Sequence, residues 1–283
     1  MVFLHAITFD SREIIVISIN IFLNLFSVKN QVKLTCDAKS WGEKRHRGIP
    51  KFWSRFGGMP SLKGLTVLDL GCGDGHLSIA MAEKGAKKVV GIDIADSIIF
   101  KKNYLRQHFP KLIGKVEFAC LDLGDYDQEN SFDLIVSRDT FEHILDLKGV
   151  LREISNRLNP SGRLYAGFGP LWNSPYGGHR RMKMRIPWGH LLLPERVIIK
   201  RVNSFRKEKI SSIQDLGLNK LALRDYRKLF EESDLKVIFW KVNHGDRFLS
   251  RLFSILAKLP LLEEYFSHDM YVILEKDNTF LRF

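Results

Sequence analysis

Three alternating glycines follow a short apolar run in "VLDLGCGDGH" (67–76). The glycines are Gly71, Gly73 and Gly75, and a loop of this kind after a strand lets a ligand approach the backbone closely. A dinucleotide-binding fingerprint would carry its third glycine at position 76, which is His76, and a phosphate-binding loop would end in Gly-Lys-Ser/Thr. Because the loop has neither feature and no basic residue, it disfavours a ligand that is held by its phosphates.

Acidic residues surround this loop. Asp69 precedes it and Asp74 lies within it, which favours a ligand that carries a positive group. A second acid, Asp93, ends the next apolar run about 20 residues after Gly71, where a carboxylate can bind the hydroxyls of an adenosine ribose. A third, Asp122, follows the run after that and can accept a hydrogen bond from an adenine amino group. Together these acids predict one binding crevice at the carboxyl edge of a parallel sheet.

The elements that must position these residues alternate along the chain. Short β-branched or apolar runs predict strands at 65–70, 87–92, 115–119, 132–137 and 162–168. Helical patterns lie between them, at 76–84, 96–108 and 146–157. A helix stop and turn is expected at 158–163 because Pro160 and Gly162 interrupt the pattern. This alternation is typical of a doubly wound α/β fold, a parallel sheet with helices on both faces.

After Phe168 the alternation breaks down into a basic stretch that is rich in Gly and Pro. Helical patterns return near 195–208 and 221–233, and two further strand-like runs occupy 235–242 and 270–276. Between these two runs, residues 246–259 predict an amphipathic helix with its apolar residues on one face and Arg251, Ser254 and Lys258 on the other. Its apolar face is expected to pack on the domain core, and contact with a membrane is the alternative.

The chain resembles the class I S-adenosylmethionine-dependent methyltransferases over residues 63–168. The resemblance rests on "VLDLGCGDGH", "GIDIAD", "ACLDL" and "FDLIVSRDTFEHI", and the "FEHI" is similar to the branch with quinone-biosynthesis and related small-molecule enzymes. It implies a Rossmann-like, doubly wound sheet of seven mostly parallel strands, in which the two late runs form an antiparallel edge hairpin. It also implies S-adenosylmethionine as the cofactor. Two helical insertions, 169–220 and 243–269, depart from the family pattern.

The resemblance implies specific roles at the strand ends. The glycines approach the methionine part of the cofactor, Asp69 orients its ammonium group, Asp93 binds the ribose, and Ile94 packs on the adenine. Arg138 lines the methionine side together with Ser137. The implied cofactor-binding residues are Asp69, Gly71, Cys72, Gly73, Gly75, Asp93, Ile94, Asp122, Leu123 and Ser137. No spacing of residues suggests a metal site.

The methyl acceptor is less defined. His143, in "FEHI", is the candidate catalytic base because it lies close to the expected methyl position, whereas Glu142 is interpreted as a structural carboxylate. The family's Asn/Asp-Pro-Pro-aromatic motif and a Pro-Cys pair are both absent, which disfavours amino-group and cytosine-C5 acceptors. A small or lipid-like molecule remains, methylated on O, N or C. The candidate substrate residues in the first insertion are His179, Arg180, Arg181, Trp188 and His190.

The charge composition indicates which kinds of partner the protein can bind. A formal net charge of +12 favours anionic partners, and the basic residues gather between positions 170 and 209. The hypothesis is therefore that Arg180, Arg181, Lys183 and Arg185 attract an anionic, sugar- or lipid-linked acceptor. The alternatives are an RNA methyltransferase and a non-catalytic protein that binds the cofactor. Neither the oligomeric state nor the acceptor follows from the sequence.

The chain divides into four predicted parts. They are an apolar N-terminal segment (1–38), a cofactor-binding core (39–168), a substrate cap (169–220) and the C-terminal part of the core (221–283). The apolar run 14–28 is shorter than a membrane span. A peripheral amphipathic helix, a helix that covers the domain and an upstream extension from a wrongly assigned start all remain open. Three widely spaced cysteines indicate a reducing, cytoplasmic compartment, with peripheral membrane contact as a further interpretation.

Overall fold

The computed structural model describes the chain outside residues 1–47, 96–97, 128–130, 185, 244–247 and 277–283. The predictions for the N-terminal segment 1–38 and for Arg185 therefore lie outside the described residues, as does the start of the predicted helix 246–259. No helix in the described part of the chain is long and apolar enough to cross a membrane.

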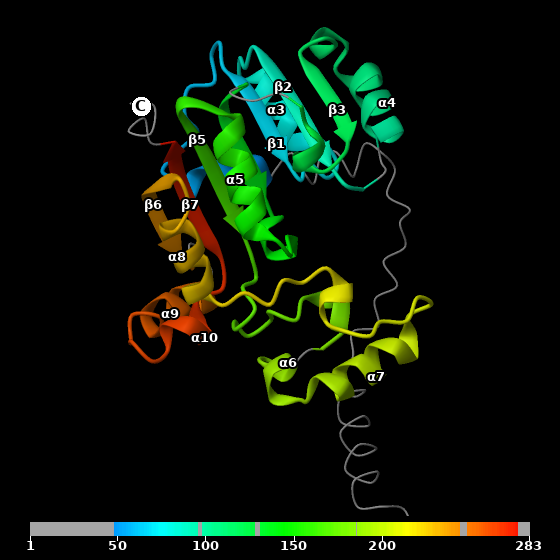
Figure 1. The fold of residues 1–283 in the computed structure, drawn as a ribbon, viewed down its shortest axis with the longest axis vertical. Helices are drawn as coiled ribbons and strands as arrows, with labels where there is room; N and C mark the ends of the chain where they lie inside the picture. Colours follow the sequence, from blue (N-terminus) through cyan, green and yellow to red (C-terminus); the bar gives the residue numbers. More distant parts are fainter. Residues whose placement is uncertain (1–47, 96–97, 128–130, 185, 244–247, 277–283) are drawn as a thin grey trace, which may run out of the picture.

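A seven-stranded sheet forms the centre of the molecule (Figure 1). Its strands are β1 (Thr66–Leu70), β2 (Lys88–Asp93), β3 (Val116–Cys120), β4 (Phe132–Arg138), β5 (Leu158–Phe168), β6 (Leu235–Val242) and β7 (Met270–Lys276). The spatial order is β3-β2-β1-β4-β5-β7-β6, in which all pairs are parallel except the two that involve β7. The predicted fold class is confirmed, including the antiparallel edge.

The register brings the carboxyl ends of the first four strands to one edge of the sheet. Leu70 pairs with Ile92 in β2 and with Ser137 in β4, while Asp93 pairs with Cys120 in β3. The strand order reverses between β1 and β4, because one connection runs outward from β1 to β3 and the next returns to the other side of β1. Such a switch point opens a crevice at the strand ends, so ligands of open α/β sheets bind there.

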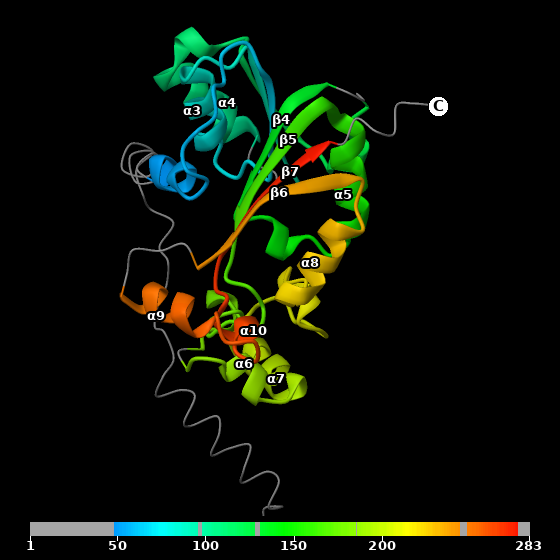
Figure 2. The same cartoon turned by 90° about the vertical axis from the view of Figure 1, so that its left-hand side faces the viewer.

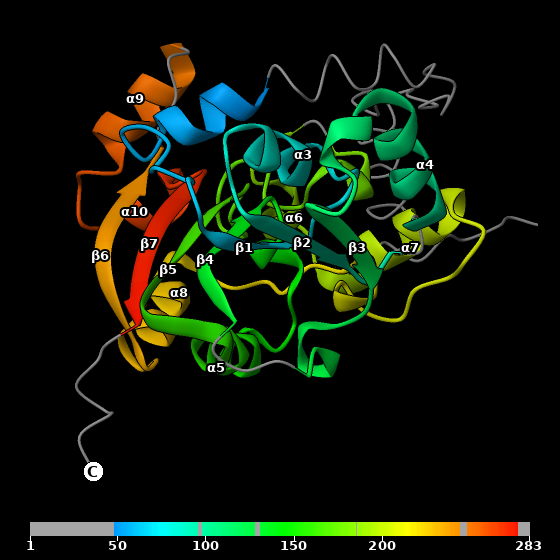
Figure 3. The same ribbon diagram turned by 90° about the horizontal axis from the view of Figure 1, so that it is seen from above.

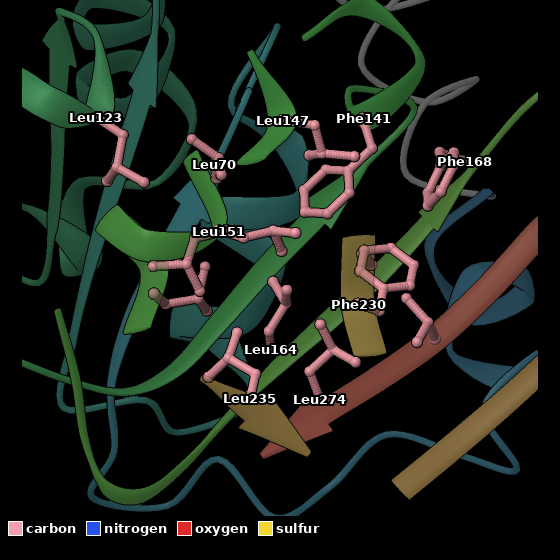
Figure 4. Packing of buried hydrophobic residues seen from close by; sticks show 14 of the residues in the cluster. Leu70, Leu123, Phe141, Leu147, Leu151, Leu164, Phe168, Phe230, Leu235 and Leu274 are labelled. Carbon is pink, nitrogen blue, oxygen red and sulfur yellow. The ribbon is translucent and has the colours of Figure 1, made fainter. Parts of the chain in front are cut away.

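Helices cover both faces of the sheet, as Figure 3 shows from above. A first layer consists of the helical residues 48–54, α3 (His76–Glu83) and α4 (Ile98–His108). A second layer, on the other face, consists of α5 (Leu147–Arg157) and α8 (Leu223–Glu231). Figure 4 shows the core under this second layer, where Leu151, Phe141 and Phe230 meet the strand residues Leu164 and Leu274. Burial of these side chains fixes the helices on the sheet and with them the loops at its edge.

Strand β5 differs from its prediction. It begins at Leu158, directly after α5, whereas a turn was expected over 158–163. The pairing with β4 shifts register between Leu158 and Arg163, and Ser161 within this stretch has a left-handed backbone with φ of 60°. The breaker residues are therefore accommodated in an irregular strand start, and the extra residues lie in a bulge beside β4.

The two insertions lie together at one end of the molecule (Figure 2). Insertion 169–220 contains α6 (Gly189–Leu192) and α7 (Glu195–Phe205) and has its own apolar cluster, in which Met182, Ile198 and Val202 are buried. Insertion 243–269 contains α9 (Phe248–Leu256) and α10 (Glu263–Phe266). Trp188 stacks edge-on against Phe266 at 5.3 Å between ring centroids, so α6 and α10 are in contact.

Helix α9 lies where a helix was predicted, but its buried and exposed faces differ from the predicted apolar and polar faces. Phe253 and Leu256 are half-buried against the body, whereas Phe248, Leu252 and Ile255 are exposed. Ser254, which was expected on the solvent side, donates a hydrogen bond from Oγ to the backbone oxygen of Asn243. The apolar residues of α9 are therefore divided between an inner and an outer face, because the helix docks with Phe253 and Ser254 toward the body.

Candidate functional site

A cavity of about 920 Å³ opens at the carboxyl edge of the sheet, at the switch point. Its walls come from the loop after β1, the ends of β2, β3 and β4, the start of α5 and the insertion 169–220. The predicted site residues that line it are Asp69, Gly71, Cys72, Gly73, Asp93, Ile94, Asp122, Leu123, Arg138, His143 and Arg181. The described residues contain no group of three or more His, Cys, Asp or Glu side chains that could hold a metal ion.

The glycine loop adopts a backbone that favours glycine at two crowded positions. Gly71 has a φ of 72°, and a Cβ on it would lie 2.2 Å from the Oγ1 of Thr140. Gly75 has a φ of 81°, and a Cβ there would lie 2.6 Å from the ring of Phe118. Gly75 precedes α3 and does not line the cavity, so it shapes the turn into the helix. Only glycine avoids both the backbone strain and these contacts.

The loop is anchored by the end of the neighbouring strand. The carboxylate of Asp93 accepts a hydrogen bond of 2.7 Å from the backbone N–H of Gly73 and one of 2.8 Å from that of Ala95. The side chain of Ile94 projects from the same strand end and is 79% exposed. Asp122 caps the short 3₁₀ turn after β3 by accepting a hydrogen bond of 3.0 Å from Gly124. Two carboxylates and one apolar side chain thus border the same end of the cavity.

Asp69 lies deeper, at the base of the loop. Its carboxylate is buried and accepts a hydrogen bond of 2.6 Å from Ser78 Oγ in α3. Burial raises the pKa of Asp69 to about 6, although that hydrogen bond and the nearby Arg138 oppose the rise. Ser137 does not line the cavity, because its hydroxyl donates a hydrogen bond of 3.0 Å to the backbone oxygen of Leu70. Its observed contact joins the ends of β1 and β4.

Cys72 is buried beside a lysine side chain. The ammonium of Lys101, which is itself buried, lies 3.4 Å from the Cys72 Sγ. Burial raises the pKa of the Cys72 thiol to about 12, and the charge of Asp69 adds to that effect. The thiol is therefore protonated at neutral pH, which agrees with a small loop residue rather than a nucleophile.

His143 lies on the wall of the cavity opposite the acidic end. Its Nδ1 is 2.6 Å from the backbone oxygen of Gly217, and because a carbonyl can only accept, Nδ1 carries the proton. The other nitrogen, Nε2, then carries the lone pair of the ring, which accepts a hydrogen bond of 3.5 Å from a guanidinium nitrogen of Arg181. Burial lowers the pKa of His143 below its usual 6.5, and the charge of Arg181 acts in the same direction. A neutral imidazole in this tautomer is able to accept a proton.

Glu142, the residue before His143, is buried and does not line the cavity. One carboxyl oxygen accepts a hydrogen bond of 3.2 Å from the backbone N–H of Gly169, and the other has no partner among the described residues. Burial raises the pKa of Glu142 to about 8, and the charges of Asp139 and Asp269 contribute to the rise. A protonated carboxyl in this place agrees with the structural role that was expected for it.

Only one of the five predicted substrate residues reaches the cavity, and it is Arg181. Arg180 is exposed beside it, and His179 contacts the rim indirectly, with its ring 5.2 Å from that of His143. The ring nitrogen of His190 lies 2.6 Å from the backbone oxygen of Trp172, and Trp188 donates to the backbone oxygen of Tyr265. His190 therefore braces the first insertion internally, whereas Trp188 joins the two insertions.

Some basic side chains of the stretch 170–209 contact other residues of the same insertion. Lys183 lies over the ring of Phe205 at 4.3 Å, and Lys209 donates to the backbone oxygens of Asn203 and Arg206. Arg201 is buried and donates to the backbone oxygen of Lys183. These contacts cap and brace the insertion, so its positive charge is not one continuous patch.

Several cavity residues were not predicted from the sequence. Thr140 packs on Gly71, Gly217 supplies the oxygen that orients His143, and Asp146 lines the cavity while it caps α5. The remaining side of the wall comes from the start of α5, at Gly149, Val150 and Glu153. Asp146 could have been found as a helix-capping residue, but Gly217 contributes only its backbone and carries no signal of chemistry.

Comparison with known proteins agrees with this geometry. Residues 61–167 match a family profile described as a methyltransferase domain. The ubiquinone biosynthesis O-methyltransferase of Idiomarina loihiensis is 35% identical over 107 residues, which are 37% of this chain and 42% of that protein. The malonyl-[acyl-carrier protein] O-methyltransferase of Acetivibrio thermocellus is 34% identical over 107 residues, 37% of this chain and 36% of that protein. The chain thus spans less than half the length of these curated relatives.

Solved structures share the fold over most of the chain. An S-adenosylmethionine-dependent methyltransferase from Mesorhizobium loti superposes with a TM-score of 0.53 at 16% identity and covers 81% of this chain and 97% of its own. The geranyl diphosphate C-methyltransferase of Streptomyces coelicolor, in complex with geranyl diphosphate and S-adenosyl-L-homocysteine, has a TM-score of 0.51 at 14% identity. That match covers 84% of this chain and 79% of the other. At such identities the likeness concerns the fold alone.

Proposed function

We propose that this chain, whose residues 61–167 match a methyltransferase domain, transfers a methyl group from S-adenosylmethionine to a hydroxyl oxygen of a small anionic acceptor. The observation that carries the proposal is the single cavity that joins the glycine loop and Asp93 to His143 and Arg181. Its volume of about 920 Å³ lies at the upper end of the ~300–1,000 Å³ typical of small-molecule sites. One cavity can therefore hold a cofactor and a small acceptor side by side.

The residues at the acidic end fit S-adenosylmethionine. A Cβ on Gly73 would meet no atom within 4 Å, so this part of the loop backbone faces open space that a ligand can take. The Asp93 carboxylate suits ribose hydroxyls, and the exposed Ile94 and buried Leu123 offer apolar contacts to a purine ring. The carboxylates of this end suit a cofactor that carries a sulfonium and an ammonium. When bound, S-adenosylmethionine supplies an electrophilic methyl group.

The opposite end fits the acceptor. In an in-line displacement the protein mainly aligns the two reactants, and a hydroxyl acceptor must also lose its proton. The Nε2 of His143 carries the lone pair of the ring and accepts that proton as the new carbon–oxygen bond forms, once the acceptor hydroxyl takes the place of the Arg181 guanidinium at this nitrogen. The carbonyl of Gly217 keeps the imidazole in the tautomer that this step requires. Arg181, which also lines the cavity, balances the charge of an anionic acceptor.

The names of relatives support an oxygen atom and an anionic acceptor. Both curated relatives are O-methyltransferases, one in ubiquinone biosynthesis and one acting on a malonyl-acyl carrier protein. The insertion 169–220 lies over the acceptor end of the cavity, so we assign it the role of a substrate cap.

Two measurements test the proposal. Calorimetric titration with S-adenosylmethionine and S-adenosylhomocysteine should give saturable binding of both ligands to the folded protein. Incubation of the protein with methyl-labelled cofactor and a cell extract should then place the label in the small-molecule fraction. A folded protein that binds neither ligand overturns the proposal, and label that appears only in RNA overturns the small-molecule acceptor.

A further inference from the structure

One face of α9 and of the turn after it consists of exposed residues in the described part of the chain. Its positions follow the spacing of a single helix face, i, i+3, i+4, i+7, i+10 and i+11. These residues are Phe248, Arg251, Leu252, Ile255, Lys258 and Leu259, here called the α9 surface. Its apolar members are 79%, 39%, 63% and 52% exposed in the order Phe248, Leu252, Ile255 and Leu259, and the neighbouring Leu261 is 87% exposed.

The helix is already docked through its other face. The ring of Phe253 packs edge-on against Phe266 at 5.5 Å, and Ser254 donates a hydrogen bond of 2.9 Å to the backbone oxygen of Asn243. The α9 surface is therefore not the side with which the helix holds to its own domain. Contiguous exposed apolar side chains of this kind mark an interaction site in soluble proteins.

The charge of this region is entirely positive. Residues 248–262 contain Arg251 and Lys258 and no acidic residue. No ion pair of Arg251 or Lys258 is present within the described part of the chain, and both side chains are exposed. The two acids that follow are directed to α8: Glu263 pairs with Arg227 at 3.0 Å, and Glu264 accepts from the backbone N–H of Leu223 at 2.6 Å. Exposed apolar side chains are thus combined with unpaired cations only.

We propose that the α9 surface binds the surface of membranes that contain anionic lipids. A helix face that combines apolar and basic side chains inserts the former at the headgroup boundary, while the latter attract anionic headgroups. This charge complementarity favours a lipid surface over a second copy of the chain, which carries the same positive charge in this region. The proposal is independent of methyl transfer. The surface belongs to the end of the molecule that holds both insertions, as Figure 2 shows, so a bound molecule turns this end toward the bilayer.

Vesicle sedimentation tests the proposal with the full chain. The wild type should sediment with vesicles of phosphatidylcholine and phosphatidylglycerol in a 7:3 ratio, and at least 10-fold less with phosphatidylcholine alone or in 0.5 M salt. Ile255→Glu should weaken sedimentation at least 10-fold, and the pair Arg251→Glu and Lys258→Glu should do the same. The matched controls Ile113→Glu and Lys111→Glu, which change exposed residues before β3, should bind as the wild type does.

Three results would overturn the proposal. If the wild-type protein remains in the supernatant with both vesicle types, the α9 surface binds no lipid. Equal binding of wild type and Ile255→Glu assigns the membrane contact to another part of the chain, such as 14–28. A dimer in sedimentation velocity that Ile255→Glu dissociates, without vesicle binding by either protein, makes the surface a contact between copies. Unchanged thermal unfolding and unchanged binding of S-adenosylhomocysteine confirm that each variant is folded.

Discussion

The carboxylate of Asp93, at the end of β2, accepts a hydrogen bond of 2.7 Å from the backbone N–H of Gly73, in the loop after β1. The residue assigned to the ribose thus also holds the loop assigned to the methionine part of the cofactor. Both halves of the proposed cofactor site are coupled through this contact. Removal of the carboxylate should therefore weaken the site more than the loss of one ligand contact would.

Asp93→Ala should weaken the binding of S-adenosylhomocysteine by about 1–3 kcal/mol. The reason is that the backbone N–H of Gly73 and the ribose hydroxyls of the ligand lose a charged hydrogen-bond acceptor. Calorimetric titration of both proteins measures the difference. Asp125→Ala is the matched control, since Asp125 is exposed near Asp122 and does not line the cavity. Equal affinities of Asp93→Ala and wild type would exclude Asp93 from the cofactor site.

Gly71→Ala should destabilise the fold more than Gly73→Ala does. Both positions have a left-handed backbone, which costs a non-glycine residue about 1–2 kcal/mol. Only at Gly71 would the new methyl group also meet a side chain, that of Thr140, which adds roughly 1–3 kcal/mol of overpacking. Urea unfolding at neutral pH measures the two free energies. If the two variants were equally stable, the close packing of Thr140 on the loop would be wrong.

His143→Ala should lower kcat about 10²–10⁴-fold for a hydroxyl acceptor, because the proton acceptor is lost. Since burial lowers the pKa of His143 below 6.5, the imidazole is neutral above that pH and becomes charged only in more acidic solution. The acid limb of the kcat/KM profile of the wild type should accordingly lie below pH 6.5 and vanish in the variant.

The control for this variant is His108→Ala, which changes an exposed histidine at the end of α4, outside the cavity. It should keep both the rate and the pH profile. A His143→Ala enzyme with a lower rate but an unchanged acid limb would make His143 a structural residue.

Glu142→Gln should remove a pH dependence of stability. The pKa of Glu142 is raised in the fold from 4.5 to about 8, so the native state holds one proton more than the unfolded chain between these values. The free energy of unfolding of the wild type is then highest below pH 4.5 with respect to this group. It falls as the pH rises toward 8, by at most about 1.4 kcal/mol per pH unit.

Urea unfolding at several pH values between 5 and 8 measures this slope. Glu142→Gln should lack that fall and should gain stability relative to wild type as the pH rises. Glu231→Gln, at an exposed position of α8, should retain the wild-type slope. A Glu142→Gln protein with the full slope would assign the titration to other groups.

Arg181→Ala should raise the KM for an anionic acceptor about 10-fold or more, since a charged hydrogen bond contributes roughly 1.5–3 kcal/mol. The KM should also depend less on salt concentration, because part of the attraction is lost. Arg180→Ala is the neighbouring control, whose side chain is exposed and outside the cavity. Equal effects of the two substitutions would mean that Arg181 acts only through the overall charge.

The strand pattern and the strand-end acids could be predicted because both are local signals. Asp69, Asp93 and Asp122 each lie at or within two residues of the end of a strand. Parallel strands bring their carboxyl ends to one edge of the sheet, independently of the loops that connect them. The glycine loop is equally local, since Gly71 and Gly75 require a backbone that other residues avoid. The fold and the acidic end of the cavity were accessible for this reason, and the cofactor was implied by the resemblance of the same motifs.

The acceptor end of the site depended on contacts between distant segments. His143 and Gly217 lie 74 positions apart in the sequence. No pattern of residue types predicts that a backbone carbonyl will be the hydrogen-bond partner of an imidazole. His190 and Trp188 have side chains that would suit a substrate site, yet in the fold His190 contacts Trp172 of its own insertion and Trp188 contacts Tyr265 of the other insertion.

The two faces of α9 show the same limit. The sequence of α9 by itself determines a helix with several apolar residues. The spacing of Arg251 and Lys258 suggests a polar side opposite these apolar residues. Which side meets the body depends on the partners Phe266 and Asn243, which come from outside the helix. The sequence by itself therefore determined the sheet and the glycine loop, because these follow from short-range backbone and burial preferences, and the resemblance of its motifs implied the cofactor. Only the tertiary structure decided which side chains face the cavity and which face solvent, because that choice is made by packing between segments far apart in the chain.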